Sequence, residues 1–590
     1  MDCSMRLINV NAFLCRETVM NTGGTVDRRR KVLECCDDES TKYAILSHRW
    51  IDSMEVDYEE IVDLEKMNVE DREDIRQRLG YKKILNTCEQ AQRDDYEWVW
   101  VDTCCIDKRS SAELSEAINS MYRLYANSRV CYAYLHDVQD PSFPTERDHA
   151  NYPKSNGWPE WFSRGWTLQE MIAPSNIQFF NKNWQIIGDK KAHACALEVI
   201  TQVPVHILTQ GLFGRRPCVA QIMSWAASRK TTRVEDRAYS LMGLLDVNMP
   251  MLYGEGKKAF HRLQLEIIRS SNDQSIFAWG WTEGIPEDMR PGSILADDPS
   301  FFGSCSYLEP LNHEEFIHTL KRSFPNVELP SIDPDCFDTF PITNRGIHMW
   351  MVLRPYRDSD STVFQAFLPC RNERGSLVTI GLALWNSNCY RFPQALPFQF
   401  KDSLQFVQVH LRYQDMPWDV TFEIDDSQVT ENGFICSDVY PSEHRGNTFT
   451  LAAMSPVCIR TYSKFLRSFS VAFGQCFGQD WIHVIDDPPE VFSEFNTGGL
   501  VAKGPDCSQN MADMYSRDDC RRSMSTRYMR LPGSNWMLRT CRFVWERWRI
   551  QIRMEVFRSS HFGNGLDEWK VFTLEVSDFF VVHMDYHDNS

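Results

Sequence analysis

Apolar and polar positions follow two different periods along the first half of the chain, and their alternation predicts strands separated by helices. Apolar runs at residues 43–47, 98–105, 130–135 and 177–180 have the length and the aromatic and β-branched content of buried strands. Between them, residues 81–94, 111–126 and 166–172 repeat apolar side chains at helical spacing. Residues 43–47 are the first expected strand. This order predicts an α/β fold, a doubly wound and mostly parallel sheet with helices on both faces.

The pattern changes in the second half of the chain. Residues 219–268 repeat apolar positions at helical spacing around a loop rich in proline and glycine at 249–256. After Trp281, turn residues become frequent, and runs such as 362–368, 377–384, 469–473 and 571–576 are typical of strands. We therefore expect an α/β domain over residues 1–215, a helical extension over 216–281, and a predominantly β region over 282–590 with a regulatory or sensing role.

Length, charge and cysteine usage narrow the class of protein. A chain of 590 residues is longer than one hydrophobic core usually organises. Its formal net charge of -18 opposes nucleic acid as a partner, because binding phosphates requires clustered Lys and Arg. We find no signal peptide and no apolar stretch long enough to span a membrane. The 20 cysteines are scattered without the spacing of a metal site. These features predict a cytoplasmic protein with reduced thiols and no bound metal.

Three segments then carry a family resemblance: YAILSHRW at 43–50, WVWVDTCCIDK at 98–108 and WFSRGWTLQE at 161–170. Their order and spacing resemble the recurring motifs of heterokaryon incompatibility (HET) domains, a fungal self/non-self and cell-death module. Further similar stretches begin at Ser110 and Arg233 and extend the resemblance over about the first 280 residues. The resemblance implies a programmed cell-death effector that associates with itself and with an incompatibility or death-signalling partner protein.

HET domains are in turn similar to Toll/interleukin-1 receptor (TIR) domains, which share the doubly wound sheet. Enzymatic TIR domains cleave NAD at the nicotinamide–ribose bond, and they use a glutamate from a Trp-x-x-x-Glu motif on a helix after the third or fourth strand. Residues Trp166 to Glu170 have this pattern and follow the strand at 130–135, after an insertion at 137–161. The resemblance therefore implies that NAD is the substrate, that no cofactor is required, and that Glu170 is the catalytic residue.

The chemistry of this cleavage needs few groups. A carboxylate can stabilise the oxocarbenium character of the ribose, and no general acid is required because nicotinamide leaves as a neutral molecule. An aromatic ring can stack on nicotinamide, and arginines can hold the pyrophosphate. Ligands of open α/β sheets bind at the carboxyl ends of the strands. The candidate substrate-binding residues are Ser47, His48, Arg49, Trp50, Asp102, Cys104, Arg164 and Trp166.

Two other functions fit the same residues. In a cysteine-dependent hydrolase, Cys104 or Cys105 would be the nucleophile, His48 would activate it, and Asp102 would orient the histidine. In a non-enzymatic adaptor, the domain would oligomerise and recruit partners, and Glu170→Gln would be tolerated. The sequence lacks both a Walker A motif and a Rossmann glycine fingerprint, which argues against a nucleotide switch.

Overall fold

The structure is a computed structural model, and it describes the chain in several segments. These are residues 5–22, 31–64, 66–212, 216–280, 292–334, 339–355, 363–385, 388–392, 403–414, 420–440, 448–451, 457–464, 467–476, 479–486, 539–545, 548–558 and 568–578. The chain divides into two compact units, which are described separately. The first comprises residues 1–287, 295–352 and 367–380, and the second comprises 288–294, 353–366 and 381–590.

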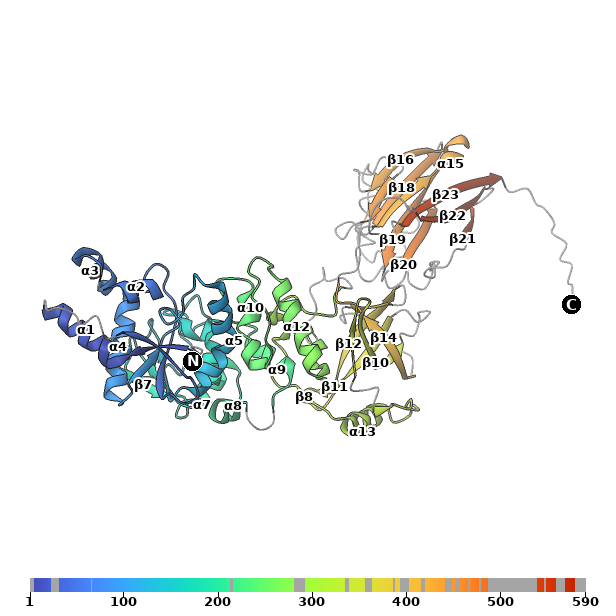
Figure 1. Ribbon diagram of the computed structural model, residues 1–590. Coiled ribbons are helices and arrows are strands. Elements are labelled where there is room, and N and C mark those ends of the chain that lie inside the picture. Colours follow the sequence, from blue (N-terminus) through green and yellow to red (C-terminus); the bar gives the residue numbers. More distant parts are fainter. Residues whose placement is uncertain are drawn as a thin grey trace. The chain divides into compact units, whose positions relative to one another are not determined.

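A seven-stranded sheet organises the N-terminal part of the first unit (Figure 1). Its order is β2-β1-β4-β3-β5-β6-β7. The strands are β1 (Met5–Asn9), β2 (Leu33–Cys36), β3 (Tyr43–His48), β4 (Trp98–Trp100), β5 (Val130–Tyr134), β6 (Ile177–Phe180) and β7 (Ile186–Asp189). Strand β3 is parallel to β4 and β5, and β5 is parallel to β6. The outer strands β1, β2 and β7 pair antiparallel.

The order of the parallel strands shows that the sheet is doubly wound. Strand β3, the first of them in the chain, lies between β4 and β5. The chain therefore moves one way from β3 to β4 and the opposite way from β4 to β5. Because parallel crossovers are right-handed, the helices of these two connections lie on opposite faces of the sheet. The connections contain α4 (Leu79–Arg93) and α5 (Ser111–Asn127), and Figure 1 shows these two helices on either side of the strands.

The helices bury the faces that their sequences predict. In α4, Tyr81, Ile84, Cys88 and Ala91 are buried at helical spacing. In α5 the buried residues are Ile118, Met121, Leu124 and Tyr125. Ser110 caps α5 by accepting a hydrogen bond from the backbone N–H of Glu113 at 3.3 Å. The Glu113 side chain binds Arg6 of β1 and the backbone N–H of Asp107, so it ties this helix to the edge of the sheet.

Several expectations for this sheet need correction. Strands β1 and β2, with helix α1 (Val10–Thr22), precede the run at 43–47, which is therefore not the first strand. Strand β4 ends at Trp100, and the apolar residues after it form a buried turn in which the Cys105 N–H bonds to the Val101 carbonyl at 2.9 Å. An apolar run reports burial and does not by itself distinguish a strand from a buried turn. Strand β2 lies at the edge of the sheet and contacts one neighbour only, so its sequence pattern is weak.

Smaller helices cover this sheet and continue the first unit. They are α2 (Tyr58–Asp63), α3 (Val69–Gln77), α6 (Thr167–Ile172), α7 (Ala194–Thr201), α8 (Val205–Gln210), α9 (Val219–Trp225), α10 (Asp236–Tyr239), α11 (Met242–Leu245), α12 (Lys258–Ser270) and α13 (His313–Ser323), with the 3-10 helices η1 (Glu160–Ser163), η2 (Gln274–Phe277) and η3 (Pro299–Phe302). The helical character predicted for residues 219–268 is confirmed, as short helices joined by turns. The predicted boundaries near residues 215 and 281 stay predictions.

The later part of the chain is rich in strands, as its sequence pattern predicts. One seven-stranded sheet has the order β8-β11-β12-β13-β14-β10-β9. Its strands are β8 (Glu309–Pro310), β9 (Ile342–Thr343), β10 (Gly346–Pro355), β11 (Val363–Arg371), β12 (Leu377–Trp385), β13 (Asn388–Phe392) and β14 (Gln405–Leu411). The runs expected at 362–368 and 377–384 correspond to β11 and β12.

The second unit adds two further sheets. In the order β17-β15-β23-β22-β21, the strands are Thr448–Leu451, Val420–Asp425, Glu568–Asp578, Trp548–Arg558 and Arg539–Trp545. In the order β16-β18-β19-β20, they are Ile435–Tyr440, Val457–Lys464, Arg467–Cys476 and Gln479–Asp486. Helix α15 (Ser427–Glu431) precedes β16. The runs expected at 469–473 and 571–576 lie in β19 and β23.

The fold bears on three chemical expectations: the state of the cysteines, membrane spans and metal sites. Cys35 in β2 is disulfide-bonded, so the expectation of reduced thiols is wrong for this residue. A disulfide depends on which Cβ atoms approach in three dimensions, which spacing along the chain does not reveal. Among the described residues, no helix is both long and apolar enough to cross a lipid bilayer. The same residues contain no cluster of three or more His, Cys, Asp or Glu arranged to hold a metal ion.

Candidate functional site

Polar side chains gather at the carboxyl ends of β3, β4 and β5. Ser47 and His48 end β3, Asp102 follows β4, and His136 and Asp137 follow β5. The connections that leave the adjacent strands β3 and β5 run in opposite directions, which makes this edge the switch point of the doubly wound sheet. Ligands of open α/β sheets bind at such points. The edge of the sheet between these strands is therefore the candidate site.

Glu170 enters this edge from helix α6. Its residue surface is 5% exposed, and its Oε2 accepts a hydrogen bond from Ser47 Oγ at 2.5 Å. Ser47 in turn accepts a hydrogen bond from Trp161 Nε1 at 2.9 Å. Thr167, at the start of α6, donates to the Trp161 carbonyl at 2.6 Å. Strand β3, η1 and α6 thus hold one carboxyl group in a fixed place.

Burial changes the acidity of Glu170. Loss of solvation raises the pKa of its carboxyl to about 8, and the nearby Asp102 carboxylate adds to the rise. Hydrogen bonds from Ser47 and Tyr125 and the charge of Arg229 act in the opposite direction. With this pKa the Glu170 carboxyl is mostly protonated near neutral pH, and it ionises in a range where a catalytic group is useful.

A second buried network surrounds His48. Its Nε2 lies 3.3 Å from Glu55 Oε2, and Lys83 Nζ donates to Glu55 Oε1 at 2.5 Å. The backbone N–H of Ile51 also donates to Glu55, at 2.8 Å. Burial tends to raise the pKa of Glu55, but the charges and hydrogen bonds of His48 and Lys83 outweigh it and lower that pKa to about 2. This network fixes the loop that follows β3 and orients the imidazole.

Asp102 links the two networks. Its Oδ2 accepts a hydrogen bond from Trp50 Nε1 at 2.8 Å, and Lys108 Nζ lies 3.8 Å from the centre of the Trp50 ring. Its Oδ1 lies 3.9 Å from His48 Nδ1. Both of these atoms are buried, and neither forms a hydrogen bond within the described residues. Buried polar atoms without hydrogen bonds are rare, and at the mouth of a sheet they indicate a place for a ligand or water.

Arginine side chains border the same edge. Arg49 Nη1 lies 2.6 Å from Glu160 Oε2, and Arg164 Nη2 donates to Thr232 Oγ1 at 3.0 Å. Burial lowers the pKa of Arg164, and the positive charge of Arg49 lowers it further. Both guanidinium groups also have negative charges near them, because Glu160 pairs with Arg49 and the charges of Asp236 and Glu170 act on Arg164.

Comparison with known proteins identifies the region that carries this edge. Residues 43–158 match the family "Heterokaryon incompatibility protein (HET)". The chain carries a HET domain. The chain is 43% identical, over 231 residues, to "Vegetative incompatibility protein HET-E-1" of Podospora anserina, and the match covers 38% of this chain and 16% of the relative. Residues 258–291 match a domain of unknown function, DUF8212. No solved structure matches the chain.

The structure brings most of the residues predicted for the site together at the sheet edge, and it places Trp166 away from that edge. Ser47, His48, Arg49, Trp50, Asp102 and Arg164 lie around the sheet edge with Glu170. Ser47 is fully buried against Glu170, which makes it a positioning residue. Trp166 donates a hydrogen bond to Asp236, on the side of α6 that faces α10. Glu170 itself follows the matched segment in the chain.

Cys104 does not fit a catalytic role in the HET domain. Its side chain is fully buried and hydrogen-bonded to Cys105. This hydrogen bond, burial and the neighbouring thiols raise its pKa far above the ordinary value. A nucleophilic cysteine needs a lowered pKa and access to its substrate, so the buried thiol opposes the cysteine-hydrolase alternative.

Sequence reasoning missed several residues of this edge. His136 and Asp137 directly follow a predicted strand, so the rule that ligands bind at strand ends could have found them. Tyr125 carries no such signal, because its place on the buried face of α5 is typical of core packing. Arg229 carries none either, because it lies in a turn more than 50 residues after Glu170 in the sequence.

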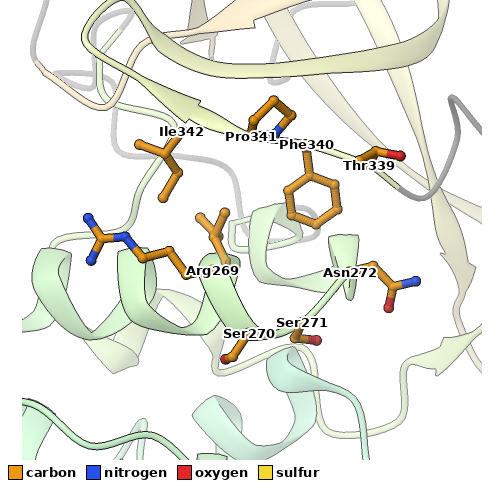
Figure 2. A pocket seen from close by; sticks show the side chains of 9 residues that line it. Arg269, Ser270, Ser271, Asn272, Thr339, Phe340, Pro341 and Ile342 are labelled. Carbon is orange, nitrogen blue, oxygen red and sulfur yellow. The ribbon is translucent and has the colours of Figure 1, made fainter.

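A cavity in the first unit lies away from this edge. It has a volume of about 640 Å³ and separates the end of α12 from residues 339–342. Figure 2 shows the Phe340 ring pointing into the space between these two segments. None of the residues predicted for the site lines this cavity.

Proposed function

We propose that this chain acts in fungal vegetative incompatibility, and that its HET domain does so by cleaving NAD at the nicotinamide–ribose bond. The family match and the name of the 43% identical relative support the first part. The observation that carries the second part is the Glu170 carboxyl, buried at the switch point of a doubly wound sheet with its pKa raised to about 8. Perturbed carboxyl groups at such edges are typical of catalytic sites.

The reaction assigns a role to each group. The bond between ribose C1′ and the nicotinamide nitrogen breaks, its electron pair leaves with neutral nicotinamide, and positive charge develops on the ribose. The ionised Glu170 carboxylate stabilises that charge. Water then adds to C1′ and releases one proton, so the products are nicotinamide, ADP-ribose and a proton. Asp102 lies close enough to act on Glu170 through its charge and favours a neutral carboxyl until substrate binds.

The surrounding side chains suit the rest of the substrate. Trp50 is 42% exposed and offers a ring face for a planar base. Arg49 and Arg164 supply two positive charges for the pyrophosphate. Since Glu170 is only 5% exposed, the substrate must displace a covering side chain or loop before it reaches the carboxyl.

The test compares nicotinamide release from NAD by the full chain and by Glu170→Gln, at several protein concentrations. Glu116→Gln makes the same chemical change on the exposed surface of α5 and serves as the control. We expect release by wild type and Glu116→Gln, and a loss of at least about 100-fold in Glu170→Gln, the usual scale for removal of an essential group. Equal rates in all three proteins would overturn the assignment.

A non-enzymatic adaptor is the second candidate, and the burial of Glu170 favours it. A carboxyl that is hydrogen-bonded to Ser47 and shielded from solvent can also serve to lock α6 against β3. In that case the folded and assembled protein releases no nicotinamide at any concentration. Glu170→Gln then keeps its ability to self-associate and to cause cell death.

A further inference from the structure

A buried arginine from outside the matched family segment reaches the Glu170 helix. Arg229 follows α9, and its residue surface is 3% exposed. Its Nε donates to the Trp225 carbonyl at 3.2 Å, and its Nη1 donates to the Arg164 carbonyl at 2.8 Å and to Thr167 Oγ1 at 3.0 Å. Its Nη2 is buried and forms no hydrogen bond within the described segments.

The position of Thr167 places this guanidinium beside Glu170. Residues three apart in a helix lie on the same side, so the hydroxyl that Arg229 binds and the Glu170 carboxyl face one direction from α6. The hydrogen bonds of the carboxyl come from Ser47 and Tyr125, and Arg229 acts on it through its charge. A buried charge is costly unless an opposite charge compensates it, and Glu170 provides that charge when ionised.

The turn that carries Arg229 is held from the other side by a second arginine. Arg237 donates to the Ala226 carbonyl at 3.1 Å and also to the carbonyl of Arg229 itself. Its Nε and Nη2 bind the two oxygens of Asp298 at 2.9 and 2.6 Å. Asp298 also caps η3 through the backbone N–H of Ser300 at 2.8 Å. A bidentate ion pair therefore connects η3 to the turn that contains Arg229.

We infer that Arg229 is a positioning residue that favours the ionised form of Glu170, and that the Arg237–Asp298 ion pair holds it in place. The segment that begins η3 thereby influences a carboxyl group more than 120 residues earlier in the chain. The catalytic part of this inference depends on the proposed function, whereas the effect on the ionisation of Glu170 does not.

The direction of the effect follows from the charges around Glu170. The groups close enough to act on it are Ser47, Asp102, Tyr125, Cys131, Arg164 and Arg229. Asp102 disfavours ionisation, and Arg229 is the buried cation that opposes it. If Arg229 is removed, or if the turn that carries it moves away from α6, its positive charge no longer opposes the effect of Asp102 on Glu170. Glu170 then keeps its proton to higher pH.

The experiment measures the ionisation of Glu170 directly in the full chain. Glutamate is labelled with carbon-13 at the carboxyl carbon, and the Glu170 signal is identified by its absence in Glu170→Gln. The variants are Arg229→Met, Asp298→Asn and, as a control, Arg269→Met at an exposed arginine of α12. Each protein is titrated by NMR, and the pH dependence of nicotinamide release is recorded in parallel.

We expect the Glu170 titration in Arg229→Met to move upward by about one pH unit, the scale of a nearby opposite charge. Asp298→Asn should move it in the same direction by a smaller amount, and Arg269→Met should leave it unchanged. An unmoved titration in folded Arg229→Met overturns the inference. If that variant does not fold, an unmoved titration in Asp298→Asn overturns it instead.

The two hypotheses fail in different ways. A shifted titration without nicotinamide release in any protein removes the proposed function and keeps the electrostatic role of Arg229. Nicotinamide release together with an unshifted titration keeps the proposed function and removes the electrostatic role of Arg229. When both hold, the acid limb of the rate profile moves upward together with the NMR titration.

Discussion

Ser47 Oγ donates a hydrogen bond to Glu170 Oε2 across 2.5 Å, which joins the end of the first parallel strand to a helix 123 positions later. The contact is fully buried, and Trp161 completes it by donating to the same hydroxyl. Burial makes the ionised form of such a carboxyl costly, and the hydrogen bond from Ser47 offsets only part of that cost. The free energy of unfolding should therefore depend on pH through this carboxyl group. That dependence can be measured without any substrate.

Replacing Glu170 by glutamine should make the protein less sensitive to alkaline pH. The pKa of Glu170 is raised from 4.5 to about 8, so wild type loses stability as pH rises through that interval, by up to roughly 5 kcal/mol. Glutamine keeps the shape and cannot ionise, and we expect Glu170→Gln to be more stable by about 1–3 kcal/mol at pH 9. Urea unfolding at pH 5 and pH 9 tests this; a variant that is equally destabilised at both values contradicts it.

Glu55 should show the opposite dependence. Its pKa is lowered from 4.5 to about 2, so its ion pairs stabilise the fold above pH 4.5, and this stabilisation is lost as pH falls towards 2. Glu55→Gln should therefore be about 2–3 kcal/mol less stable than wild type at pH 7 and nearly equal to it at pH 2. Unfolding curves at the two pH values measure the difference. The exposed Glu116→Gln should show no such change, and a cost for Glu55→Gln that does not vary with pH would argue against the ion pairs.

Lys190 should prove necessary for the helix that carries Glu170. Its Nζ donates to the carbonyls of Met171, Ile172 and Pro174 at the end of α6. Lys190→Met leaves these buried acceptors without a donor and should lower the free energy of unfolding by about 2–3 kcal/mol. The exposed neighbour Lys191→Met is the matched control. Thermal unfolding distinguishes them, and identical melting temperatures for the two variants would contradict the capping role.

Gly165 should be intolerant of any side chain. A Cβ at this position would lie 2.5 Å from Thr231 Cγ2 and 3.2 Å from Ser240 Oγ. Gly165→Ala should cost about 1–3 kcal/mol through overpacking. Thr231→Ser removes the clashing methyl group and keeps the hydroxyl, so the double variant should recover part of that loss. A double-mutant cycle with denaturant unfolding measures the recovery, and strictly additive costs would show that the close contact is unimportant.

Alkylating reagents should not modify Cys104 and Cys105 in the folded protein. Cys104 and Cys105 are buried and hydrogen-bonded together, whereas Cys15 and Cys195 are exposed. Mass spectrometry after brief iodoacetamide treatment should find label on the exposed pair first. Nicotinamide release should survive this treatment and the change Cys104→Ala. Rapid labelling of Cys104 together with loss of activity would restore the cysteine-hydrolase hypothesis.

The amino-acid sequence determined the parallel strands of the first sheet, apart from the end of β4, and the helices that connect them. The four parallel strands and the helices α4, α5 and α6 follow from apolar spacing, because burial of one face imposes that spacing on any sequence. The motif residues Ser47, His48 and Asp102 could be assigned to strand ends for the same reason. The β-rich later half was predicted from its turn residues and alternating runs.

Tertiary structure alone decided which of these residues act together. The raised pKa values of Glu170 and Cys104 and the link from Asp298 through Arg237 to Arg229 depend on how the folded chain brings separate segments together. Local periodicity reports which side of an element is buried and carries no information on the partner that covers it. Solvation and Coulomb energies depend on that partner, so the chemistry of the site became visible only in the folded chain.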